Sequence, residues 1–107
     1  MGKVSKEALF APRLPEDDVE IPGVGTVRVR GLSRAEVLKV QRLGKAERDA
    51  HMIALGMVDP PMPVTDVQRW AEASPAGEME AVSRRIGELS GVLEGAQKSG
   101  LRDVRDE

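Results

Sequence analysis

The residues that could support catalysis are few and do not form a recognised catalytic pattern. His51 is the single histidine among 107 residues, and the chain contains no cysteine. One histidine without thiolates cannot build a zinc site, and no serine nucleophile motif accompanies it. We therefore expect a protein that is not an enzyme and that uses no cofactor.

Two further motifs resemble ligand sites but lack essential parts. Gly23-Val24-Gly25 lacks the third glycine of a dinucleotide-binding loop, and a strand is expected after it where that loop requires a helix. The acidic run Glu16-Asp17-Asp18-Glu20 could hold a cation, but it lacks the glycine and the spacing of a calcium loop. We expect a turn at the first segment, a solvated acidic surface at the second, and no metal site.

Charges of both signs are interspersed along the chain, with 16 basic and 18 acidic residues and a net charge of −2. This balance argues against nucleic-acid binding. Four arginines could still contact phosphate: Arg84, Arg85, Arg102 and Arg105. The helix expected around the first two also holds four glutamates that offset their charge: Glu78, Glu80, Glu88 and Glu94. A small DNA-binding regulator remains an alternative.

The chain has no apolar run long enough for a signal peptide or for a membrane span of about 20 residues. The absence of cysteine also excludes a disulfide framework. We expect a soluble protein of a reducing cytoplasm, with no contact with a membrane.

A β-hairpin is predicted from Val19 to Arg30, because valine and isoleucine alternate there with charged residues. The expected register places the two apolar faces together and leaves Pro22 to Thr26 as the loop. Its pairs are Ile21 with Val27, Val19 with Val29, Glu20 with Arg28, and Asp18 with Arg30.

Three to four helices should follow the hairpin, which gives an α+β fold that is mainly α. Ser33 and Glu36 form a capping box at the first helix start, and a break is expected near Leu43-Gly44. Later starts are predicted at Thr65, with Gln68, and at Ser74-Pro75, from which the last helix should run to about Lys98. We expect a flexible N-terminal arm (1–18), one domain (19–99) and a charged C-terminal tail (100–107). A short turn at Ala8 to Phe10 could dock the arm.

The predicted last helix has two parallel rows of residues. The apolar row consists of Met79, Val82, Ile86, Leu89, Leu93 and Ala96, and the small row of Ser83, Gly87, Gly91 and Gly95. The apolar row could pack in the domain's own core or against a partner. Each helical glycine costs about 1 kcal/mol relative to alanine, so the small row suggests close approach of another backbone. We predict partner binding at Ser83, Gly87, Gly91 and Gly95.

Aromatic residues are limited to Phe10 and Trp70, and five methionines accompany them. Trp70 is expected to face the core together with Val67, although an exposed binding role is the alternative. Methionine repacks easily, so the methionines favour an adaptable surface. They are Met1, Met52, Met57, Met62 and Met79.

The order and length of these segments resemble the tail assembly chaperones of long-tailed (siphovirus-type) bacteriophages. The resemblance runs from about Asp17 to Lys98 through five segments: Val19 to Arg30, Gly31 to Glu36, Leu55 to Asp59, Val64 to Val67, and Glu88 to Val92. One departure is Pro60-Pro61-Met62-Pro63, where the family often has an acidic, glycine-bearing turn and then a phenylalanine.

The resemblance implies a non-catalytic role. Such chaperones bind the tape measure protein, keep it soluble and bring tail tube subunits to it in the host cytoplasm. They are not retained in the mature virion, and many occur in a short and a frameshifted longer form. This chain would be the short form, and self-association is possible. A structural virion connector protein is a further alternative.

Overall fold

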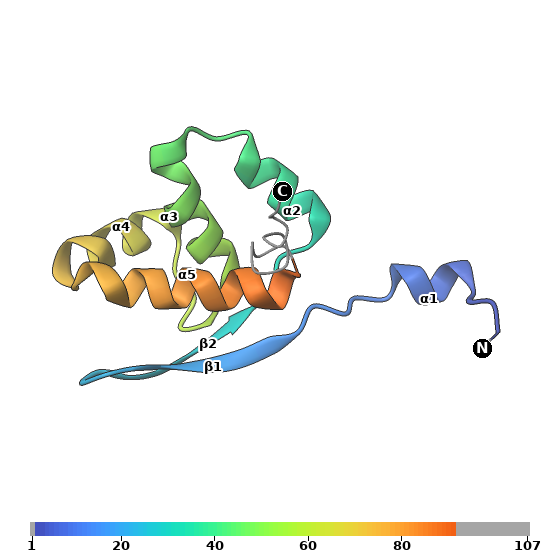
Figure 1. Cartoon of the computed structure of the whole chain (residues 1–107), viewed down its shortest axis with the longest axis horizontal. Coiled ribbons are helices and arrows are strands. Elements are labelled where there is room, and N and C mark those ends of the chain that lie inside the picture. Colours follow the sequence, from blue (N-terminus) through green and yellow to red (C-terminus); the bar gives the residue numbers. More distant parts are fainter. Residues whose placement is uncertain (1, 92–107) are drawn as a thin grey trace, which may run out of the picture.

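A computed structural model describes residues 2–91 (Figure 1). It confirms an α+β, mainly α, fold in which a hairpin precedes the helices of the body. In chain order the elements are α1 (Lys6–Phe10), β1 (Glu16–Ile21), β2 (Gly25–Arg30), α2 (Arg34–Gln41), α3 (Lys45–Gly56), β3 (Met57–Asp59), α4 (Val64–Ala73) and α5 (Ala76–Ser90).

Helix α5 lies between the hairpin and the other helices of the body (Figure 1), and it contacts β1, β2 and α3. The strands form an antiparallel sheet in the order β1-β2-β3. Apolar side chains from the sheet, the β2–α2 junction and helices α2 to α5 meet in one core. Its buried members are Ile21, Val29, Leu32, Val40, Ile53, Met57, Val67, Val82 and Ile86.

The predicted register of the hairpin is wrong by two residues. Ile21 pairs with Gly25, Val19 with Val27 and Asp18 with Arg28. The physical reason is a tight turn, in which the Val24 N–H donates to the Ile21 carbonyl at 3.0 Å. Gly23 adopts a φ of +80°, as the third position of a type II turn requires. A shift of two residues keeps every side chain on its predicted face, because side chains alternate along a strand.

The sheet is larger than the predicted hairpin, because β1 starts earlier and a third strand pairs with β2. Strand β1 begins at Glu16, so three residues assigned to the arm belong to the hairpin. Strand β3, which was not predicted, pairs with β2 through Met57 opposite Val29. The prolines that follow β3 end it after three residues, and such a short edge strand escapes detection by alternation.

The helix boundaries agree with the sequence in the first half of the body. Ser33 caps α2, its hydroxyl accepts from the Glu36 N–H, and Glu36 completes the capping box. The predicted break at Leu43-Gly44 is confirmed, since α2 ends at Gln41 and α3 begins at Lys45.

The predicted caps of the last two helices are wrong. Pro63 and Pro75 occupy the N-cap positions of α4 and α5, with no side-chain cap. The Ser74 hydroxyl donates to the Trp70 carbonyl at 2.8 Å. It therefore hydrogen-bonds a carbonyl in the last turn of α4 and does not cap the start of α5. Helix α5 ends at Ser90, because Gly91 takes a left-handed C-cap conformation with φ +77°. The remainder of the span predicted to Lys98 lies outside the described residues.

Two glycines outside α5 allow this helix to pack closely. A Cβ on Gly31 would lie 2.5 Å from the Leu89 carbonyl oxygen, and a Cβ on Gly56 would lie 2.5 Å from Cδ1 of Ile86. The Leu32 N–H donates to the Ser90 hydroxyl at 2.7 Å, which fixes the same contact by a hydrogen bond. The β2–α2 junction is thus held directly against the backbone of α5.

A salt bridge also stabilises the β2–α2 junction. The Arg30 guanidinium donates to both carboxylate oxygens of Glu36, at 2.9 and 2.8 Å, and both side chains are largely shielded from water. The hydrogen bonds from Arg30 are the main cause that lowers the pKa of Glu36 from its ordinary value of 4.5 to about 2. The same carboxylate accepts the Ser33 N–H, so one charge serves both the pair and the helix cap.

We predict opposite effects for two glycine-to-alanine changes. Gly31→Ala should lower the free energy of unfolding by about 1–3 kcal/mol, because its Cβ meets backbone that cannot move away. Gly77→Ala, in the first turn of α5 with nothing within 4 Å, should raise it by up to about 1 kcal/mol. Urea unfolding measures both values, and a Gly31→Ala protein as stable as the parent would refute the close approach.

The lowered pKa of Glu36 predicts that the free energy of unfolding depends on pH in the acid range. Since the folded pKa of Glu36 lies below the unfolded one, the stabilisation is complete above about pH 4.5 and is lost as the pH falls towards 2. Its size at neutral pH is roughly 2–3 kcal/mol. Glu36→Gln should flatten the unfolding profile between pH 5 and 2, and Arg30→Met should do the same.

A double-mutant cycle separates this pair from other acid effects. If the two changes act on one interaction, the double variant should lose no more of the pH dependence than either single variant. An undiminished acid dependence in Glu36→Gln would show that other carboxylates cause it.

Candidate functional site

The structure places three of the four predicted partner-binding residues, and Gly95 lies outside the described residues. Ser83 is half-buried, and its hydroxyl donates to the Met52 sulfur of α3 at 3.8 Å. Gly87 is buried, and Gly91 is the exposed C-cap of α5. The row therefore does not form one outward face: two members lie against the chain's own fold and the third ends the helix.

The apolar row of the same helix faces the core wherever the structure describes it. Val82 and Ile86 are fully buried, and Met79 and Leu89 pack against the core cluster. Leu93 and Ala96 lie outside the described residues. Of the two predicted alternatives, packing in the domain's own core applies to these four side chains.

The outward face of α5 is polar and offers little apolar area. Its exposed positions include Glu80, Ala81, Arg84 and Glu88, and Arg84 lies 3.9 Å from Glu80 across one turn. Such a mixed face suits contact with water. The exposed large apolar side chains among residues 2–91 lie on other elements.

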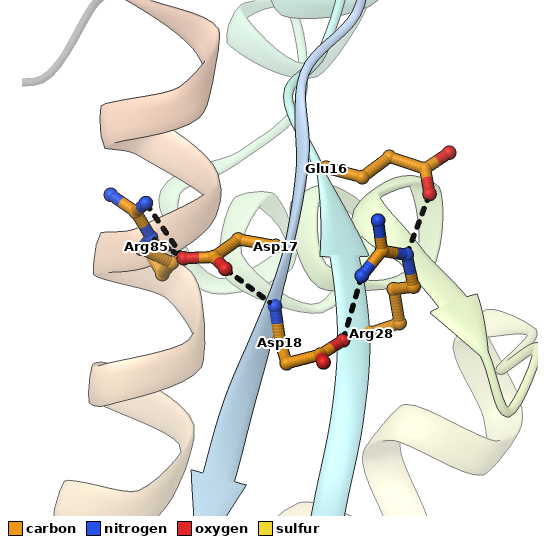
Figure 2. Close-up of polar contacts among 5 residues, drawn as sticks. All are labelled: Glu16, Asp17, Asp18, Arg28 and Arg85. Carbon is orange, nitrogen blue, oxygen red and sulfur yellow. Dashed lines mark hydrogen bonds and ion pairs between the residues drawn. The ribbon is translucent and has the colours of Figure 1, made fainter.

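The acidic run at the start of β1 is neutralised by arginines from two different elements (Figure 2). Asp17 accepts from Arg85 of α5 at 2.7 and 2.9 Å, while Arg28 of β2 donates to Glu16 and to Asp18, each at 2.8 Å. The hydrogen bond from Arg85 lowers the pKa of Asp17, and the bonds to Glu16 and Asp18 raise the pKa of Arg28. These carboxylates join β1 to its neighbours.

No group of three histidine, cysteine or acidic side chains within residues 2–91 could hold a metal ion. His51 places its Nδ1 2.9 Å from the Glu47 carbonyl of its own helix. Arg28, Arg30 and Arg85 each form an ion pair with a carboxylate. These three arginines therefore form structural ion pairs within the described residues.

An apolar hollow of about 210 Å³ lies between the tip of the hairpin and the α4–α5 corner, and we call it the Trp70 hollow. Trp70 is half-buried against the core, and its indole N–H donates to Glu78 at 2.6 Å. This bond satisfies the one polar atom of the ring and fixes its orientation. The hollow is lined by Ile21, Val24, Val27, Met57, Pro60, Met62, Trp70 and Glu78.

Sequence reasoning predicted Trp70 and the adaptable methionines separately but did not bring them together. Met57 and Met62 reach the hollow because β3 joins the sheet, and β3 was not predicted. Val24, at the hairpin tip, is 78% exposed and was read only as part of a turn. The proline-rich segment around Met62 was the signal that could have indicated the hollow. Its prolines exclude a helix there, so the apolar side chain of Met62 lies outside any helix.

None of the helices among residues 2–91 is long and apolar enough to cross a membrane. Comparisons with family models, with curated proteins and with solved structures find no match for this chain.

Proposed function

We propose that this chain is a non-catalytic tail assembly chaperone, which binds the tape measure protein in the host cytoplasm and helps to recruit tail tube subunits. The observation that supports binding is the Trp70 hollow, and the identity of the partners rests on the resemblance described above. The protein would act during assembly and be absent from the mature virion.

The Trp70 hollow has the properties needed to accept one apolar side chain of a helical segment. It is open to solvent, and Glu78, its single charged lining residue, is occupied by the indole N–H. Met57 and Met62 are flexible enough to fit leucine, isoleucine or phenylalanine alike. A shallow, adaptable pocket suits a chaperone, which must hold many related segments weakly and release them.

The position of the hollow also indicates that its lining residues serve to bind a partner and not to stabilise the fold. The core beneath it is completed by buried residues such as Ile21 and Met57, so the hollow is not needed to hold the fold. Val24 stands at its rim with most of its surface in water. An exposed valine beside a tryptophan gives a small apolar patch that a partner helix could cover.

We predict that Val24→Asp and Met62→Glu each abolish the ability to keep the tape measure protein soluble. Both changes put a charge at the hollow, and desolvating it on binding should weaken the complex at least about tenfold. The assay is co-expression with the tape measure protein, followed by measurement of the soluble fraction and by affinity capture of the complex.

Leu38→Asp is the matched control, because Leu38 is 39% exposed on α2 and does not line the hollow. It should support the tape measure protein as well as the parent does. A parent chain that neither binds this protein nor keeps it soluble would refute the proposal. Mass spectrometry of purified particles tests the connector alternative, since a connector would be present and a chaperone absent.

A further inference from the structure

The N-terminal arm exposes large apolar side chains. Val4, Leu9 and Phe10 are 64, 58 and 72% exposed, and α1 has no buried residue. The turn that was expected to dock the arm at Ala8 to Phe10 is a helix, but it stands away from the body (Figure 1). Isolated exposed apolar residues are ordinary, whereas three within seven residues of one projecting segment need a partner.

The arm is also built to hold this helix. The Ser5 hydroxyl accepts the Ala8 N–H at its start, and the Arg13 guanidinium donates to the carbonyls of Ala8, Leu9 and Ala11 at its end. A helix of five residues is nevertheless marginal without packing. Caps at both ends of such a short helix indicate a segment prepared to present Leu9 and Phe10 to another surface.

The charge of the arm restricts what that surface can be. Residues 2–14 contain three cations, Lys3, Lys6 and Arg13, and one anion, Glu7, which gives a net charge of 3 − 1 = +2. The receiving surface should therefore combine an apolar floor with negative charge at its edge.

One groove on the body has this combination. It lies between α3 and α4 and has a volume of about 360 Å³, and its apolar lining includes the half-buried Ala50 and Met79 as well as the buried Ile53 and Val67. Ala46 and Ala71 are exposed small residues that leave room for a ring, while Asp49 and Glu72 are exposed carboxylates with no cation among the lining residues. Neither carboxylate forms an ion pair with any residue between 2 and 91.

The other hollows fit the arm less well. The hollow lined by Leu43, His51 and Leu55 has Lys39 at its edge, which would repel the basic arm. The hollow beside Leu32 to Arg34 is lined by the arm's own base, from Ala11 to Leu14. In the Trp70 hollow the single carboxylate is already bonded to the indole.

We propose that the arm of one copy docks in the α3–α4 groove of a second copy, with Leu9 and Phe10 on the apolar floor and Lys3 and Lys6 facing Asp49 and Glu72. The mode is a short amphipathic helix in a groove. Exchange in both directions gives a two-fold dimer, whereas exchange in one direction gives an open chain of copies. The inference stands on the arm and the groove alone and does not depend on the chaperone role.

A second copy is favoured over the same copy by the way the arm leaves the body. The Gly31 N–H donates to the Pro15 carbonyl at 2.9 Å, which anchors the base of the arm beside the start of α2. From there α1 extends away from the body, at the opposite end from α4 (Figure 1). Phe10 lies five residues before Pro15, so the end of the helix can lie at most about 17 Å from its anchor.

Sedimentation and light scattering of the full chain over a concentration series test the proposal. The parent should associate into dimers or larger species as its concentration rises. Phe10→Asp should weaken this association at least about tenfold, and it should leave the body folded because Phe10 is 72% exposed on a helix without buried residues. Leu38→Asp, at an exposed leucine of α2 that lies outside the arm and does not line the groove, should associate like the parent.

Charge reversal identifies the groove. Asp49→Lys with Glu72→Lys should abolish association, and so should Lys3→Glu with Lys6→Glu. Mixing these two variants should restore it, because each arm then finds a groove of opposite charge. A parent that stays monomeric, a Phe10→Asp variant that associates normally, or a mixture that fails to associate would each overturn the proposal. Loss of chaperone activity at the Trp70 hollow, with association intact, would leave it standing.

Discussion

The close approach of α5 to the β2–α2 junction is the contact on which the rest of the structure depends. The absence of a side chain at Gly31 lets the Leu89 carbonyl come within contact distance of the turn. The Ser90 hydroxyl then accepts the Leu32 N–H and donates to the Ile86 carbonyl, so the end of the helix is tied to the junction. The hairpin, which would be marginal alone, thereby gains a helix to cover its valine face.

This contact also determines where the binding surfaces can lie. It holds the base of the hairpin at the C-terminal end of α5, and Asp17 and Arg85 reinforce the same end. The tip of the hairpin extends towards the α4–α5 corner, where it forms one side of the Trp70 hollow. The arm leaves at the opposite end, next to Gly31. This contact thus separates the Trp70 hollow, where we propose partner binding, from the arm, where we propose contact with another copy.

The sequence predicted those features that depend on neighbouring residues and missed those that depend on distant ones. The Ser33–Glu36 cap and the break at Leu43-Gly44 arise within a few residues, and both are confirmed. The alternation of the hairpin identified the faces but not the partners, because a shift of two residues satisfies the faces equally. Strand β3 and the Trp70 hollow needed tertiary contacts between the hairpin, β3, the β3–α4 loop and the α4–α5 corner, which no local pattern contains.

The small residues of the last helix show why such a pattern is ambiguous. Close packing of two backbones needs a missing side chain on one of them, and the spacing of glycines in a helix reveals only one side of the contact. Here the missing side chains at two close contacts are Gly31 and Gly56, which belong to the elements packed on α5. The inward surface of the described helix is therefore already occupied by the chain's own fold. Gly87 is buried, so a partner could reach it only by displacing the groups that cover it, whereas apolar side chains of the hairpin tip and the arm are already exposed.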